Sequence, residues 1–111
     1  MTFRREPLGQ KAPRVKDPAY LAKVAELPCV ICEALGEAQL TPTQVHHTIH
    51  GRYSQRKTPD RDVIPLCRAH HMTGEGGKIA IHREPVAWWQ LYGQDGYYIK
   101  RTQDRINGGT K

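Results

Sequence analysis

The stretch Pro65-Leu-Cys-Arg-Ala-His-His71 contains a cysteine and two adjacent histidines, all of which can ligate a metal ion. The other candidate ligands lie near it in the sequence. All six histidines fall between residues 46 and 82, and all three cysteines fall between residues 29 and 67. Such clustering indicates a metal-binding region, and the spacings suit two metal sites better than one.

The composition limits the class of protein. The chain has 111 residues, the size of one small domain, and 38% of them are hydrophobic. A domain of this size buries only a modest core, so a structural metal would help it fold. The formal net charge of +6 favours a polyanionic partner, with nucleic acid before a membrane. The same charge is also compatible with a soluble basic protein that has no such partner.

Signals for export or membrane insertion are not expected. The chain has no run of about 18 apolar residues, and no apolar segment follows its basic start, which predicts neither a transmembrane helix nor a signal peptide. The odd number of cysteines argues against a disulfide framework. We therefore expect a cytoplasmic protein whose cysteines serve metal or redox chemistry.

The chain is predicted to be an α+β domain between two polar ends. Residues 1–16 are rich in Arg and Lys and form a basic N-terminal arm, residues 17–100 form the domain, and residues 101–111 form a polar C-terminal tail. Asp17-Pro18 is a typical helix start, and the helix is expected to end at Pro28.

The central region reads as two short strands followed by a helix. β-branched residues favour strands over residues 43–50 and 63–67, with a polar loop over residues 51–62 between them. Residues 68–72 are expected to begin a helix that the glycines within residues 74–77 interrupt. Residues 78–82 resume order, as a helix or a strand. A further helix is expected over residues 85–92, with Trp88, Trp89 and Tyr92 as core side chains.

Cys29-x-x-Cys32 and Cys67-x-x-His70 have the spacing of zinc knuckles, in which two residues between the ligands let both reach one ion from a tight turn. Together the four residues predict a closed, tetrahedral Cys3His zinc site whose binding energy supports folding. His50 is an alternative to His70. A redox function for the two knuckle cysteines would require a preceding strand and a following helix, whereas a helix is expected to precede them.

The other histidines suggest a second site. His46 and His47 are adjacent on an expected strand, so their side chains point to opposite faces. His71 is held beside the knuckle, and the glycine-rich turn can return His82 toward it. A divalent ion with three imidazoles and open positions is typical of catalysis, and phosphodiester hydrolysis needs both a cation and a base for water. The alternative is that these histidines only contact phosphates.

His46-His47 and Asp62-Val-Ile-Pro-Leu-Cys-x-x-His70-His71 together resemble the signature of the HNH nucleases, which have a ββα-metal core. More narrowly, residues 17–100 are similar to the phage Ref-like nucleases, which enhance recombination in association with RecA. That narrower likeness also includes Leu-Pro-Cys29-x-x-Cys32, Lys57-x-x-Asp60 and Trp89-x-x-Tyr92-Gly93.

The resemblance implies a role for each matching residue. His46, His71 and His82 would hold a catalytic divalent ion, Mg²⁺ or another metal, and His47 would be the general base. Asp62 would orient His47, at a position where the family usually has asparagine. The gap between His71 and His82 is longer than in the family pattern, so His50 is an alternative to His82.

Basic residues of the loop between the strands are expected to contact DNA phosphates, although a solvated loop is the alternative. Arg68 and Lys78 are further candidates. The loop residues are Arg52, Arg56, Lys57 and Arg61.

The sequence thus predicts a small zinc-stabilised HNH domain that hydrolyses DNA with a divalent metal. The resemblance implies products with 5′-phosphate and 3′-hydroxyl ends, a role in phage recombination or DNA processing, and a RecA filament as a partner besides DNA. The rival interpretation is a zinc-knuckle module that binds DNA without cleaving it.

Overall fold

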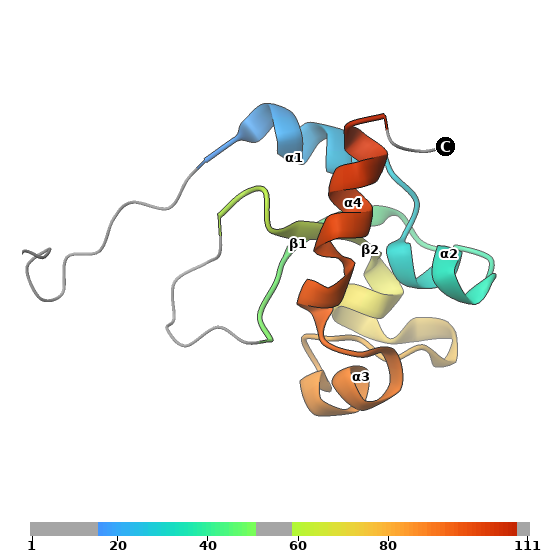
Figure 1. Cartoon of the computed structure of the whole chain (residues 1–111). Helices are drawn as coiled ribbons and strands as arrows, with labels where there is room; N and C mark the ends of the chain where they lie inside the picture. The colour runs from blue at the N-terminus through green and yellow to red at the C-terminus, as the bar shows by residue number, and fades with distance from the viewer. Residues whose placement is uncertain (1–15, 51–58, 109–111) are drawn as a thin grey trace, which may run out of the picture.

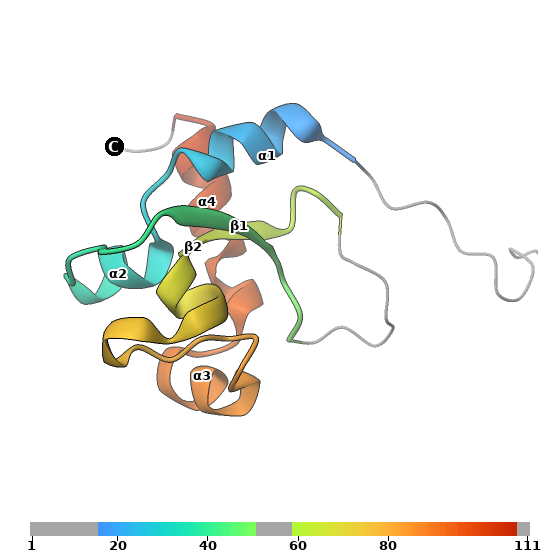
Figure 2. The ribbon, with the colours of Figure 1, turned by 180° about the vertical axis from the view of Figure 1, so that it is seen from behind.

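The computed structural model describes residues 16–50 and 59–108 and shows a small α+β arrangement built on two strands. Strand β1 (Thr43–His47) pairs antiparallel with β2 (Val63–Cys67), with Val45 opposite Pro65. Helix α4 lies across one face of this sheet in Figure 1, and β1 is on the side nearer the viewer in Figure 2. The predicted α+β class and the second strand are confirmed, whereas the first strand ends at His47 and not at residue 50.

Helix α1 (Pro18–Ala25) starts where the sequence predicts. The Asp17 side chain accepts a hydrogen bond from the main-chain N of Tyr20 at 3.2 Å, and Pro18 occupies the first turn. The helix ends before Pro28. Its buried residues Tyr20 and Val24 pack with Val63 of β2 in a small apolar cluster.

Helix α2 (Val30–Leu35) begins at the first knuckle, so part of the expected 33–42 connector is helical. The Cys29 Sγ accepts a hydrogen bond from the main-chain N of Cys32, and Gly36 ends the helix with a φ of 69°. The main apolar cluster lies between this helix, β2 and α3. Its largest fully buried members are Ile31, Ile64, Leu66, Ile81 and Trp88.

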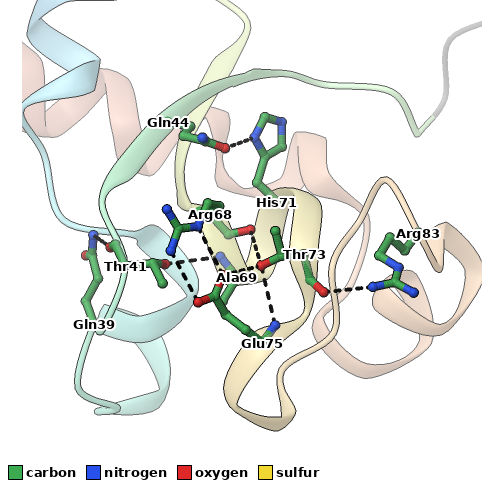
Figure 3. Close-up of polar contacts among 9 residues, drawn as sticks. All are labelled: Gln39, Thr41, Gln44, Arg68, Ala69, His71, Thr73, Glu75 and Arg83. Carbon is green, nitrogen blue, oxygen red and sulfur yellow. Dashed lines mark hydrogen bonds and ion pairs between the residues drawn. The ribbon is translucent and has the colours of Figure 1, made fainter.

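The chain after β2 forms a π-helix, η1 (Ala69–Thr73), and then a short 3₁₀ turn, η2 (Glu75–Gly77). Gly74 between them has a φ of 73°, and a Cβ at that position would come within 3.0 Å of the Lys78 carbonyl oxygen. Figure 3 shows Arg68 paired with Glu75, which also accepts a hydrogen bond from the Thr73 hydroxyl. The predicted interruption of the helix by glycine is confirmed.

Residues 78–82 are neither helix nor strand, which resolves the alternatives that the sequence leaves open. The main-chain N of Ile81 donates to the His70 carbonyl at 2.9 Å, and that of His82 donates to the His71 carbonyl at 3.1 Å. These two bonds draw the segment back alongside η1. They place His82 next to the knuckle by main-chain pairing rather than by a regular element.

Helix α3 (Pro85–Tyr92) has the predicted bounds and begins at its proline. Trp88 is fully buried, as expected for a core residue. Trp89, in contrast, is 48% exposed, so the expectation that both tryptophans serve the core is wrong for Trp89. Successive residues of a helix face different directions, and only the side of Trp88 meets the sheet.

The C-terminal tail predicted from residue 101 is instead mostly helical. A 3₁₀ turn, η3 (Asp95–Tyr98), leads into helix α4 (Ile99–Ile106). Thr102 is buried and its hydroxyl donates to the Tyr98 carbonyl at 3.0 Å, while Arg105 pairs with Glu33 at 2.7 Å. The sequence does not predict this helix, because its composition is polar and only a narrow apolar stripe faces the sheet.

Within residues 16–50 and 59–108, no helix is long and apolar enough to cross a membrane. The basic arm, up to residue 15, and the last residues, 109–111, lie outside the part of the chain that the structure describes.

Helix α4 should therefore contribute to stability. The side chain of Ile106 packs against the cluster of Tyr20, Val24 and Val63. We expect Ile106→Ala to lower the free energy of unfolding by about 1–2 kcal/mol, less than for a fully buried isoleucine. The exposed Lys100, whose side chain is 84% accessible, provides the control Lys100→Ala, for which the expected loss is below about 0.5 kcal/mol. Equal urea midpoints for the two variants would show that this segment behaves as a tail.

Candidate metal centres

Cys29, Cys32, Cys67 and His70 bring four potential ligand atoms together in the core. All four residues are buried, and their ligand atoms lie within 4.8 Å of one another. The Nδ1 of His70 lies 3.5, 3.6 and 3.4 Å from the Sγ atoms of Cys29, Cys32 and Cys67, respectively. The Cys32 and Cys67 Sγ atoms are 3.9 Å apart. The two knuckles thus meet, with Cys29 and Cys32 from the start of α2, Cys67 from the end of β2 and His70 from η1.

These separations fit a tetrahedral zinc site. With Zn–S bonds of about 2.3 Å and Zn–N bonds of about 2.0–2.1 Å, tetrahedral angles place two sulfurs about 3.8 Å apart and a sulfur and a nitrogen about 3.5 Å apart. The observed distances are close to both values. Three thiols and an imidazole are also the donors that zinc prefers in structural sites. The cluster is therefore a buried Cys3His group that could bind a metal such as zinc.

The pKa values of the cysteines bear on the redox alternative. Burial raises the pKa of the Cys29 thiol and that of the Cys32 thiol above the ordinary value. Burial acts in the same direction on Cys67, but hydrogen bonds from the His70 main chain and from Thr41 outweigh it, so that the pKa of Cys67 is lowered. Thiols with raised pKa values are poor nucleophiles, which disfavours the redox alternative for Cys29 and Cys32.

His70 also has a neighbour on its outer side. Burial lowers the pKa of His70, which keeps the ring neutral as metal ligation requires. Its Nε2 is buried and has no hydrogen-bond partner among the residues that the structure describes. It lies 3.9 Å from a carboxylate oxygen of Glu37, which pairs with Lys78 at 3.0 Å. The ring thus turns Nδ1 toward the cysteines and Nε2 toward this ion pair.

A second cluster consists of His46, His71 and His82, whose ligand nitrogens also lie within 4.8 Å of one another. The ring centroids are 5.0 Å apart for His46 and His71, 5.2 Å for His46 and His82, and 4.8 Å for His71 and His82. The three rings meet edge to face. This is the trio that the sequence analysis expects to share an ion.

The hydrogen bonds of His46 leave one nitrogen for a ligand. His46 is buried, and its Nε2 lies 2.8 Å from a carboxylate oxygen of Asp95. Its Nδ1 is buried and has no hydrogen-bond partner within residues 16–50 and 59–108. A buried polar atom without a partner is costly, and a metal ion would satisfy it.

His71 is oriented in a comparable way. Its Nδ1 donates to the side-chain oxygen of Gln44 on β1, 2.8 Å away, because that oxygen can only accept (Figure 3). The Nε2 of His71 therefore carries the lone pair. Burial, reinforced by the neighbouring His46 and His82, lowers the pKa of His71 to about 3. Burial also lowers the pKa of His46, although Asp95 opposes the shift. Both rings are thus neutral and able to ligate.

His50, the alternative ligand for either site, forms hydrogen bonds with other groups. Its Nε2 donates to the Pro85 carbonyl at 3.1 Å, and its Nδ1 accepts a hydrogen bond from the main-chain N of Asp95 at 3.0 Å. Both ring nitrogens are therefore used. Of the two candidates for the last position in the second cluster, the structure brings His82 to it.

His47 points away from His46, as expected for neighbours on a strand, and meets a different carboxylate. Its Nε2 lies 2.9 Å from the Oδ1 of Asp60, whose Oδ2 accepts a hydrogen bond from the main-chain N of Asp17 at 2.8 Å. The resemblance implies that Asp62 orients His47. In the structure the carboxylate that contacts the Nε2 of His47 is that of Asp60, and the main-chain carbonyl of Asp62 accepts hydrogen bonds from Thr48. The motif Lys57-x-x-Asp60, which is part of the resemblance to the Ref-like nucleases, is the sequence signal that could have pointed to Asp60.

The chain matches the family described as protein of unknown function (DUF968) over residues 1–108. It belongs to the DUF968 family. No curated protein and no solved structure was found to be significantly similar to it. The family description gives no activity, so the function of this DUF968 chain must be argued from its two clusters.

The basic residues of the DUF968 chain are placed only in part. Arg52, Arg56 and Lys57 lie outside the described residues. Arg61 is exposed and its Nε donates to Asp17 at 2.9 Å. The further candidates for phosphate contact are also paired with acids, Arg68 with Glu75 and Lys78 with Glu37.

Two adjacent residues of the DUF968 chain offer a sharp test of the zinc site. His70 belongs to the Cys3His cluster and His71 belongs to the histidine cluster. We expect His70→Ala to lose tightly bound zinc and cooperative unfolding, because the metal supplies folding energy. We expect His71→Ala to retain about one zinc per chain and a native circular dichroism spectrum. Zinc would be measured by mass spectrometry after gel filtration with a weak chelator.

Retention of zinc and native structure by His70→Ala would contradict the assignment of that cluster. Loss of the tight zinc by His71→Ala would contradict the division of the two histidines between two sites.

Proposed function

We propose that this chain is a metal-dependent endonuclease of the HNH type that hydrolyses DNA phosphodiester bonds. The observation that carries the proposal is the convergence of His46, His71 and His82, with the Nδ1 of His46 buried and unpartnered, beside a strand neighbour, His47, that is paired with Asp60. Metal-assisted hydrolysis of a phosphodiester uses a bound cation and a general base. The residues proposed for these two roles are neighbours on β1.

The order of the elements supports the HNH type. One histidine of the cluster lies on β1, a loop and β2 follow, and the next histidine lies on the helical turn η1 directly after β2. The first strand thus carries both the adjacent histidines, and the helical turn carries ligands of both clusters. The resemblance to the ββα-metal nucleases rests on the same order.

The donor set favours a transition metal. Within the described part of the chain the cluster consists of three imidazoles, which suit zinc, copper, iron or nickel, whereas Mg²⁺ prefers oxygen ligands. Such an ion, when bound, would neutralise charge on the phosphate and on the leaving oxygen. The residues that would hold it are His46 through Nδ1, His71 through Nε2, and His82.

His47 has the environment of a general base. The Asp60 carboxylate accepts from its Nε2, so the proton sits on that nitrogen and the lone pair of the ring is on Nδ1, the atom that would take a proton from water. The side chain of His47 is 16% exposed, which lets water reach it, whereas that of Asp60 is almost fully buried. Asp60 would hold the ring and stabilise the imidazolium that forms.

The substrate class is proposed from charge and resemblance. A formal net charge of +6 favours a polyanion, and in the sequence Arg52, Arg56 and Lys57 follow the histidine pair within ten residues. A RecA filament as a partner, and a role in phage recombination or DNA processing, are proposed from the resemblance to the Ref-like nucleases alone.

Substitution of His47, the proposed general base, tests the proposal. We expect His47→Ala to lower the rate of plasmid nicking in Mn²⁺ by at least about 100-fold, because the base that activates water is lost. Zinc content, fold and DNA binding should be retained. Asp60→Asn should give a smaller loss, since the ring remains but its orientation is weaker.

Lys100→Ala, on the exposed side of α4, serves as a control for preparation and handling and should nick at the wild-type rate. Supercoiled plasmid, linear duplex and single-stranded DNA would each be tested, with and without RecA filaments. A wild-type chain that binds these DNAs but cleaves none of them in any divalent metal would favour the rival function, a zinc-knuckle module that binds DNA without catalysis.

A further inference from the structure

We infer that Asp95 is a positioning residue for the histidine cluster, which it serves by fixing the tautomer of His46 so that Nδ1 faces His71 and His82. The inference rests on the proposed metal-binding role of that cluster. Nothing in the sequence signature of the strands and knuckles points to Asp95, which lies in the 3₁₀ turn η3 after α3.

The Asp95 carboxylate is fully buried and is surrounded by donors. Its Oδ2 lies 2.8 Å from the Nε2 of His46 and accepts a hydrogen bond from the main-chain N of Ile49 at 2.6 Å. Its Oδ1 accepts a hydrogen bond from the main-chain N of His50 at 3.1 Å. Each oxygen of Asp95 thus accepts a main-chain N–H group, as the oxygens of an ionised carboxylate do.

An ionised carboxylate only accepts hydrogen bonds, so its contact with His46 requires the proton of that ring to be on Nε2. The remaining nitrogen, Nδ1, then carries the lone pair. Among the described residues that atom has no hydrogen-bond partner although it is buried, and it is the nitrogen of His46 that Asp95 leaves for the histidine cluster. The carboxylate therefore selects which nitrogen of His46 is offered to a metal ion.

A carboxylate behind a ligating histidine has two effects on metal binding. It holds the ring in the ligating orientation, and it increases the basicity of the nitrogen that faces the ion. Asp95 is well suited to the first effect, because the same side chain also fixes the main chain at Ile49 and His50, just after β1.

A second link ties this carboxylate to the core. The main-chain N of Asp95 donates to the Nδ1 of His50, whose ring lies 5.9 Å from that of Trp88 and 5.8 Å from that of Trp89. Because Trp88 is a fully buried core residue, the position of Asp95 relative to β1 is set by the packing of α3.

The test measures binding of Co²⁺ to zinc-loaded protein by the visible absorption of the ion, without DNA. We expect Asp95→Asn to weaken Co²⁺ binding to the histidine cluster by roughly 10–100-fold and to leave the zinc of the Cys3His cluster in place. Asp60→Asn is the matched control, since it removes the charge of another buried aspartate that contacts the other histidine of the pair. It should bind Co²⁺ with wild-type affinity.

A second measurement needs no variant. Long-range ¹H–¹⁵N correlation spectra of the zinc-loaded wild-type chain, with no second metal added, should show His46 as the neutral Nε2–H tautomer. The Nδ1–H tautomer would overturn the inference, as would wild-type Co²⁺ affinity in a folded Asp95→Asn variant.

The outcomes separate this inference from the proposed function. If the wild-type chain binds no second ion, both fail. If it binds the ion and Asp95→Asn binds it equally well, only the role of Asp95 fails. If Asp95→Asn weakens binding of the second ion but the wild-type chain cleaves no DNA, the role of Asp95 stands and the nuclease proposal fails.

Discussion

The convergence of three thiols and one imidazole at Cys29, Cys32, Cys67 and His70 is the constraint on which the rest of the structure depends. It joins the start of α2, the end of β2 and the turn η1, three segments that a two-stranded sheet cannot hold together by itself. A chain of 111 residues with a small apolar core gains most from such a link. When the link is made, the direction of the chain after Cys67 is fixed.

That direction determines where the histidine cluster forms. His70 and His71 are neighbours in a π-helical turn, yet one faces the thiols and the other faces His46 and His82. Fold and proposed chemistry are thus divided between adjacent residues. The same division occurs on β1, where His46 is bonded to Asp95 and His47 is bonded to Asp60, so that each histidine of the pair has its own buried carboxylate.

Local patterns in the sequence predict the parts of this arrangement that depend on nearby residues. The knuckle spacings, the helix start at Asp17-Pro18, the strand 63–67 and the helix 85–92 all depend on contacts over a few positions, and the structure has each of them. The partner Asp95 could not be derived in this way. The contact of Asp95 with His46 spans 49 positions and depends on how α3 packs. The sequence does not predict helix α4 for a related reason: its few apolar residues can be recognised as buried only when the elements they pack against are known.

Under the proposed function two metal ions lie side by side, one bound by thiols for the fold and one bound by histidines for hydrolysis. Anomalous diffraction from crystals of protein loaded with one zinc per chain and then given Co²⁺ tests this arrangement, since the two elements are distinguished by wavelength. The account predicts zinc among Cys29, Cys32, Cys67 and His70, and a second ion bonded to the Nδ1 of His46, the Nε2 of His71 and the ring of His82. A single ion shared by His70 and His71, or a histidine cluster that stays empty at saturating metal, would contradict it.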